Sequence, residues 1–168
     1  MSSEAVAAQD AIKPVFAGSL PANIKELVMP HVLNHERILN AAIKIFALNG
    51  YRKASTDVIV QEAGISKGLL FHYFESKKGL YTFVLEYSAR YMMMELGAGM
   101  NDSEKNMFDR CVMAEECKIR MLQNYPYLDL FLISIQGESD PEVCEEAKKW
   151  ADDLENTYVL HMLQHFLL

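Results

Sequence analysis

Apolar residues recur three or four positions apart along most of the chain, the spacing that places side chains on one face of an α-helix. The first such stripe consists of Ile38, Ala42, Ile45 and Phe46. It predicts an amphipathic helix over about residues 35–48. The next two residues, Asn49-Gly50, tolerate the left-handed backbone with which many helices end.

Two short helices are expected next, joined by a tight turn. Ser55 or Thr56 can cap a helix that ends at Gly64, and Ser66 can cap a second one over residues 67–73. Two short helices on either side of a glycine turn predict a helix-turn-helix unit.

Helical patterns continue to the end of the chain, over about residues 77–99, 102–124, 127–135 and 141–168. No run alternates apolar and polar residues between turns, so no strand is expected. The predicted fold class is therefore all-α. It begins with a leader over residues 1–34, helical around residues 23–29. A three-helix helix-turn-helix domain over residues 35–78 and a second helical domain over residues 79–168 follow.

The second short helix of the helix-turn-helix unit has two different faces. Leu70 and Phe74 lie one turn apart and should hold it to its neighbours. The opposite face carries Gly68 and His72, with Lys67 at its start. Because these side chains leave one side of the helix small, it can lie close against a DNA major groove.

One pattern extends over residues 37–85. It consists of Asn49-Gly50-Tyr51, Thr56, Ala63-Gly64-Ile65-Ser66-Lys67-Gly68, Phe71-His72-Tyr73-Phe74 and Ser76-Lys77. This pattern resembles the DNA-binding signature of the TetR family of transcriptional regulators. The resemblance implies that Thr56, Phe71 and Lys77 lie against DNA phosphates. It also implies that six residues approach the groove: Ser66, Lys67, Gly68, Leu69, His72 and Tyr73.

The same resemblance implies a cytoplasmic transcriptional regulator that binds a double-stranded DNA operator as a homodimer. Residues 79–168 would bind an effector and dimerise, and the protein would be a repressor that leaves its operator when the effector binds. No cofactor is implied. Two positions depart from the family pattern, Val60 for the usual Ala and Phe71 for the usual Tyr. The second loses a hydroxyl that could bond a phosphate, which would cost about 1 kcal/mol of operator binding.

The charge distribution fits a chain that binds DNA with one end. The net charge is −7, but residues 35–78 hold seven Lys and Arg against four acidic residues. Residues 79–168 hold seven basic against sixteen acidic residues. Because DNA binding depends on the local field, the basic segment can bind phosphates although the whole chain is acidic.

Several other classes of protein have little support. No apolar run is long enough for a membrane span, and the first ten residues lack the basic start of a secretory signal. The three cysteines are odd in number, which argues against a disulfide framework. His161 and His165 have the i, i+4 spacing of metal ligands, but no third ligand is evident and no metal site is predicted. No convergent catalytic set is present, so we expect no enzyme.

The second helical region is rich in methionine and aromatic residues, which can line an apolar cavity between helices. We therefore expect a small apolar or aromatic effector. Its candidate contacts are Tyr87, Tyr91, Met94, Phe108, Met121, Phe131 and Trp150. The alternative is that most of these residues are ordinary core.

Two further alternatives stay open. The chain could be a helical ligand-binding or scaffolding protein that has the motif without using it on DNA. The last helix ends in Phe166-Leu167-Leu168, an apolar end that something else should cover. Either the chain is truncated, or dimerisation uses this helix together with the leader.

Overall fold

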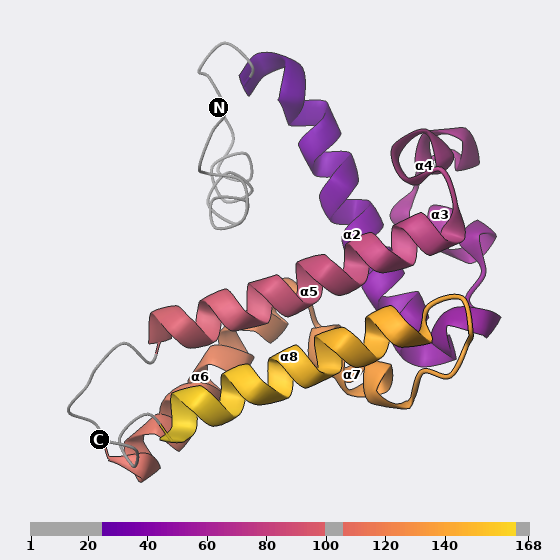
Figure 1. The fold of residues 1–168 in the computed structure, drawn as a ribbon. Helices are drawn as coiled ribbons and strands as arrows, with labels where there is room; N and C mark the ends of the chain where they lie inside the picture. Colours follow the sequence, from indigo (N-terminus) through magenta and orange to yellow (C-terminus); the bar gives the residue numbers. More distant parts are fainter. Residues whose placement is uncertain (1–24, 100–105, 164–168) are drawn as a thin grey trace.

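The computed structural model describes residues 25–99 and 106–163, and every regular element within these ranges is a helix (Figure 1). The elements are α2 (Lys25–Lys53), α3 (Thr56–Ala63), α4 (Lys67–Phe74), α5 (Lys77–Gly99), α6 (Met107–Asn124), α7 (Leu128–Ser134), the 3₁₀ helix η2 (Ile135–Gly137) and α8 (Cys144–Leu163). The predicted all-α class is confirmed.

The short helices begin and end at the residues that their capping chemistry favours. The Ser55 hydroxyl accepts a hydrogen bond from the backbone N–H of Asp57, and the Ser66 hydroxyl accepts one from Leu69. Gly64 ends α3 in the left-handed conformation, with φ 62°. Gly50 has φ 68° and ψ 173°, so it interrupts the helical path of α2 three residues before its end, as Asn49-Gly50 predicted.

Two helix boundaries differ from the sequence prediction. The expected border at residue 34 falls inside α2, which runs without interruption through Pro30. The sequence prediction ended the helical part of the leader at about residue 29, before Pro30, but a proline removes only one backbone donor and the helix continues past it. Residues 102 and 103, the expected start of the following long helix, lie outside the described residues. The described α6 begins at Met107, capped by the Asn106 side chain.

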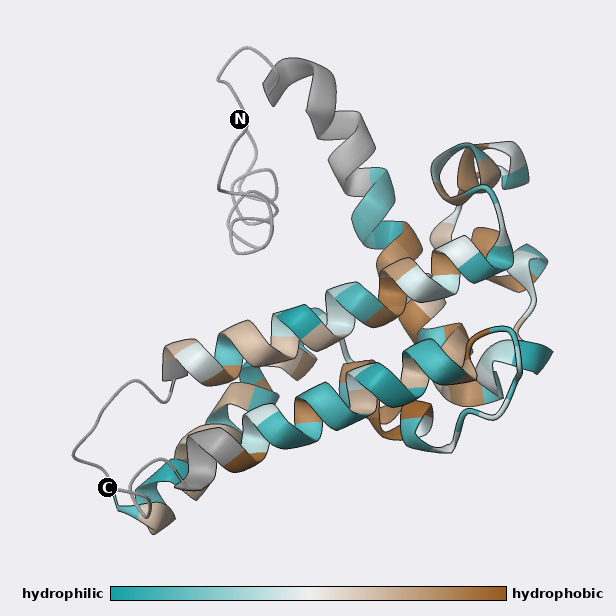
Figure 2. Ribbon diagram, viewed as in Figure 1, coloured by the Kyte–Doolittle hydropathy of each residue, from teal (hydrophilic) through white to brown (hydrophobic). Residues whose placement is uncertain are grey.

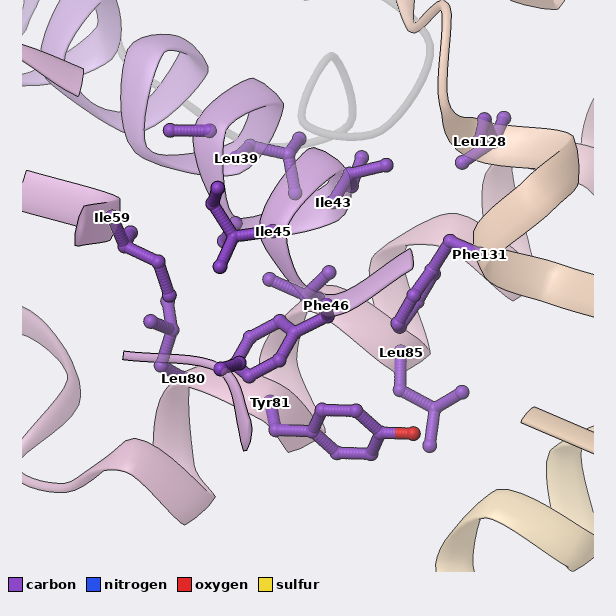
Figure 3. Close-up of a cluster of buried hydrophobic side chains, with 14 of the residues drawn as sticks. Leu39, Ile43, Ile45, Phe46, Ile59, Leu80, Tyr81, Leu85, Leu128 and Phe131 are labelled. Carbon is purple, nitrogen blue, oxygen red and sulfur yellow. The ribbon is translucent and has the colours of Figure 1, made fainter. Parts of the chain in front are cut away.

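The core forms where α2, α3, α5 and α7 meet. Figure 3 shows Phe46 of α2 beside Tyr81 of α5 and Phe131 of α7. The Phe46 and Tyr81 rings meet edge to face, with their centroids 4.9 Å apart. All three side chains are almost completely buried. Because one core is shared by elements from both halves of the chain, the helix-turn-helix unit is fixed directly to the rest of the molecule.

The helices give the molecule two distinct ends (Figure 1). The helices α3 and α4 lie beside the start of α5, whereas the other end of α5 lies near α6 and the end of α8. Figure 2 shows hydrophobic positions gathered where α2 crosses α5, whereas α8 is largely hydrophilic on the side in view. Within the described ranges, no helix combines the length and the apolar character that crossing a membrane requires.

Candidate nucleic-acid interface

Helix α4 is attached by one face and open on the other, and it stands at the edge of the molecule (Figure 1). Leu70 is buried and Phe74 is half-buried, and both pack with the core cluster. Lys67, Gly68 and His72 are exposed. A Cβ atom placed on Gly68 would meet no other atom within 4 Å. This is the open, small face that a DNA groove requires.

An aromatic cluster supports α4 from behind. The His35 ring of α2 meets the Tyr73 ring edge to face at 4.5 Å between centroids, and lies 6.1 Å from Phe74 and 6.4 Å from Phe83. Tyr73 is half-buried, so much of its ring packs against the protein while the rest faces outward. The sequence did not single out His35, because its contact with α4 joins segments almost forty residues apart.

Lys67, a predicted groove contact, and Lys77, a predicted phosphate contact, both have protein partners. The Lys67 ammonium lies 2.7 Å from a carboxylate oxygen of Asp57, and both side chains are at least half exposed. The Lys77 ammonium donates to the backbone carbonyl of Arg52 at 3.2 Å and lies 4.6 Å from the centroid of the Tyr51 ring. These partners hold the two ammonium groups in defined positions in the free protein.

The turn between α3 and α4 is held by a further arginine. The Arg37 guanidinium of α2 donates to the carbonyl of Gly64 at 3.2 Å. A Cβ atom at position 64 would displace this guanidinium, and the positive φ of Gly64 favours glycine there. On the same side of the unit, Lys44 of α2 pairs with Glu62 of α3 at 2.7 Å. These contacts fix the angle between α3 and the preceding helix.

The nine predicted DNA contacts occupy one end of the molecule. Thr56 opens α3, Lys77 opens α5, and the other seven lie in or next to α4. Ser66, Lys67, Gly68 and His72 are exposed, whereas Thr56, Leu69, Phe71, Tyr73 and Lys77 are half-buried. Their roles on DNA remain predictions.

A hydrogen-bonded junction joins the turn after α2 to the loop before α8. Glu138 accepts the backbone N–H of Tyr51 at 3.0 Å, and Glu142 accepts the Tyr51 hydroxyl at 2.7 Å. The Arg52 guanidinium pairs with Asp140 at 3.1 Å. Burial raises the pKa of Tyr51, and the hydrogen bond to Glu142 raises it further. The pKa of Asp140 is lowered by the N–H of Glu142 and by Arg52.

An open groove of about 850 Å³ lies along α8, with walls from α5, α6, α7 and η2. Its apolar lining is Met92, Leu96, Leu132, Ile133, Ile135, Ala151, Leu154 and Tyr158. Its charged lining is Asp129, Glu138, Glu145, Asp152, Glu155, Lys118 and Lys148. Acidic groups outnumber basic ones, so the groove is amphipathic and carries a negative charge.

None of the seven predicted effector contacts lines this groove. Met121 and Phe131 are buried in the core, where Tyr87 and Tyr91 also pack. The Tyr87 and Tyr125 hydroxyls share a hydrogen bond of 2.7 Å, and burial raises the pKa of all three tyrosines, 87, 91 and 125. Met94 and Trp150 pack at the edge of the same core, and Phe108 is 76% exposed. The structure therefore gives most of this set a packing role.

Other kinds of site find no support in residues 25–99 and 106–163. These ranges contain no group of three or more His, Cys, Asp or Glu side chains able to hold a metal ion. His165 lies outside the described residues. All three cysteines are free thiols, with Cys117 buried and Cys111 exposed.

Comparison with known proteins supports the regulator interpretation. Residues 38–82 match the family model of bacterial regulatory proteins, tetR family. The HTH-type transcriptional regulator UidR of Escherichia coli is 50% identical over 44 residues, which are 26% of this chain and 22% of that protein. An alpha-galacturonidase of Lachnoclostridium phytofermentans is 46% identical over 43 residues, 26% of this chain and 9% of that protein. The matched segments thus span less than a quarter of the length of each of these two relatives.

A solved structure shares the fold. It is a TetR family transcriptional regulator, PfmR from Thermus thermophilus, with a TM-score of 0.54 and 22% identity over 75% of this chain and 66% of that one. An exposed helix-turn-helix on an all-helical body defines the class as a helix-turn-helix regulator. Residues 38–82 carry the helix-turn-helix segment of the tetR family of bacterial regulatory proteins, and the all-helical fold is the one found in a regulator of that family. The match to this family model supports the prediction of a regulator rather than an enzyme.

Proposed function

We propose that the chain represses transcription by binding a DNA operator through α4 and releases it when a small molecule binds. The observation that carries the proposal is the exposed face of α4, with Gly68 open and Lys67 beside it. The backbone of α4 can approach base edges closely at Gly68, while Lys67 and Lys77 supply charge for the phosphates.

The effector site that the geometry favours is the groove along α8. Its apolar wall suits the apolar or aromatic body expected from the sequence, and its excess of carboxylates favours an effector that also carries a positive charge. The residues 35–78 would then act as the DNA-binding domain and residues 79–168 as the effector and dimerisation domain.

A cytoplasmic homodimer completes the proposal. Two copies would present two α4 helices to successive major grooves, about 34–36 Å apart, on a near-palindromic operator. An effector that prefers a different separation would shift the population away from the DNA-bound form.

A fluorescence anisotropy titration against DNA from upstream of the protein's own gene tests the proposal. The wild-type chain should bind this DNA more tightly than a scrambled fragment of equal length, with a steep dependence on salt. The Lys67→Ala/His72→Ala double variant should lose about tenfold or more in affinity, because it removes a charge and a groove contact together.

The matched control is the Lys149→Ala variant, which removes one positive charge from exposed α8, away from α4. It should bind as the wild type does. Binding that does not distinguish the two fragments, or equal losses in both variants, would favour a helical ligand-binding or scaffolding protein that carries the motif without using it.

A further inference from the structure

The turn at the start of the helix-turn-helix unit, residues 50–53, is held by three carboxylates from one loop. This loop, residues 138–142, joins η2 to α8 and is called the acidic loop below. We infer that the acidic loop positions the helix-turn-helix unit for DNA, and that Glu138 connects this unit to the groove along α8. The inference rests on the proposed function, because its final readout is DNA binding.

Both carboxylate oxygens of Glu138 are engaged. One accepts the backbone N–H groups of Ser139 and Asp140, each at 2.9 Å, which gives the acidic loop its shape. The other accepts the N–H of Tyr51 at 3.0 Å. One side chain therefore both folds its own loop and holds the turn 87 residues earlier in the chain.

The two other carboxylates of the acidic loop hold the same turn. Asp140 accepts the N–H of Glu142 with one oxygen, at 3.0 Å, and the Arg52 guanidinium with the other, at 3.1 Å. Glu142 accepts the Tyr51 hydroxyl at 2.7 Å. Three bonds from three carboxylates to two consecutive residues fix the turn in both position and orientation.

The held turn reaches a predicted phosphate contact. The carbonyl of Arg52 accepts the Lys77 ammonium at 3.2 Å, and the same ammonium lies over the Tyr51 ring. A displacement of Tyr51 and Arg52 would therefore carry the Lys77 ammonium with it. Lys77 is the first residue of α5 and follows the end of α4 by three residues, and the family resemblance places it against a DNA phosphate.

The other side of Glu138 belongs to the groove, which it lines together with Ile135 and Gln136 of η2. A groove occupant that attracts this carboxylate would compete with the N–H of Tyr51 for it. Contacts thus form one continuous path: the groove meets Glu138, the acidic loop holds Tyr51 and Arg52, and these two residues hold Lys77.

The variant that tests the inference is Glu138→Gln. Two N–H donors compete for one oxygen of this side chain, so the remaining amide oxygen should turn towards Ser139 and Asp140. The amide nitrogen then faces the N–H of Tyr51, and that one hydrogen bond is lost. The control is Glu145→Gln, which removes the same charge from the same groove but lies on α8.

Two measurements on the full chain follow. Hydrogen exchange at residues 51–53 should become faster in Glu138→Gln and stay unchanged in Glu145→Gln. Affinity for the upstream DNA fragment should fall about threefold to tenfold, the range for one lost hydrogen bond. The slope of log affinity against log salt should fall by about one, because one phosphate contact is weakened. A purely structural role of Glu138 would leave that slope unchanged.

Faster exchange with unchanged affinity and slope would overturn the inference while the proposed function stands. Unchanged exchange at residues 51–53 would overturn it as well. A wild-type chain that ignores the DNA sequence would instead overturn the proposed function, and the exchange data would still decide whether the acidic loop holds the turn. If Glu138→Gln folds poorly, Tyr51→Phe removes the bond to Glu142 and should move the same two readouts.

Discussion

At the scale of single residues, most cations of the helix-turn-helix unit are engaged with the protein itself. Lys67 pairs with Asp57, Lys44 with Glu62, and Lys77 with a carbonyl group. The family resemblance placed Lys77 against a DNA phosphate and Lys67 at the groove. It could not show their partners, because Asp57 meets Lys67 only when α3 packs on α4, and Arg52 meets Lys77 only when α2 packs on α5.

The pair between Lys67 and Asp57 leads to a prediction for Asp57→Asn. Exposed ion pairs contribute about 0.2–1 kcal/mol, so breaking this one to free Lys67 for a phosphate costs little. In Asp57→Asn no ion pair has to be broken before Lys67 binds DNA. The substitution also removes a negative charge that would repel the DNA phosphates. Operator affinity in an anisotropy titration should therefore rise about twofold to fivefold.

The matched control for this prediction is Glu62→Gln. It removes an acidic charge from the same helix but releases Lys44, on the side towards α2. Its affinity should stay within about twofold of the wild type, within the range of one surface pair. A lower affinity for Asp57→Asn would show that Lys67 is not the cation that meets the phosphate.

At the scale of the elements, local signals fixed α3 and α4, and distant contacts decided the rest. The caps at Ser66 and Gly64 are readable from the sequence, and so is the anchor at Leu70. The path of α2 through Pro30 was missed because local rules for proline do not include the helix around it. The seven effector contacts stay a prediction, because a methionine or aromatic stripe has the same spacing in a core as in a cavity wall.

Helix α4 gives a prediction in which two measurements move in opposite directions. Gly68→Ala adds a methyl group into open space on the free protein. Alanine is favoured over glycine in a helix by about 0.5–1 kcal/mol, so the free energy of unfolding should rise by up to that amount. Affinity for the operator should fall, because the methyl group keeps the helix away from the bases.

Urea denaturation and anisotropy measure the two effects. The control is Gly137→Ala in η2, where an added Cβ also meets no atom within 4 Å. It should leave DNA binding unchanged. If Gly68→Ala bound the operator as tightly as the wild type, that side of α4 would not be the side that lies against DNA.

At the scale of the whole molecule, an acidic half is joined to a basic end by charged contacts as well as by the shared core. The acidic loop meets Tyr51 and Arg52 through three carboxylates. Composition predicted the separation of charge. It gave no sign of the contacts between the two regions, because they join residues 87 to 91 positions apart.

Asp140 makes this junction sensitive to acid. Its pKa is lowered in the folded protein, so its carboxylate contributes stability above its ordinary pKa, and that contribution is lost as the pH falls through the lowered value. Asp140→Asn keeps a capping oxygen for Glu142 but loses the charge paired with Arg52. Wild type should therefore be more stable than this variant at pH 6, with the difference shrinking below about pH 4.

Chemical denaturation at several pH values measures this difference. Asp152→Asn, on the groove side of α8, serves as the control for the loss of one negative charge. Its stability should follow the wild type in parallel across the same pH range. Equal stability of wild type and Asp140→Asn at every pH would mean that Asp140 contributes through its capping oxygen alone, which the asparagine keeps.

The single tryptophan of the chain lies where it can report on the body of the molecule. Trp150 of α8 is half-buried, and the guanidinium of Arg90 from α5 lies 5.6 Å from the centre of its ring. Indole emission shifts to longer wavelength when water reaches the ring. Any event that separates α5 from α8 should therefore change the intrinsic fluorescence of the unlabelled protein. Compounds that cause such a separation can be found by fluorescence screening without DNA.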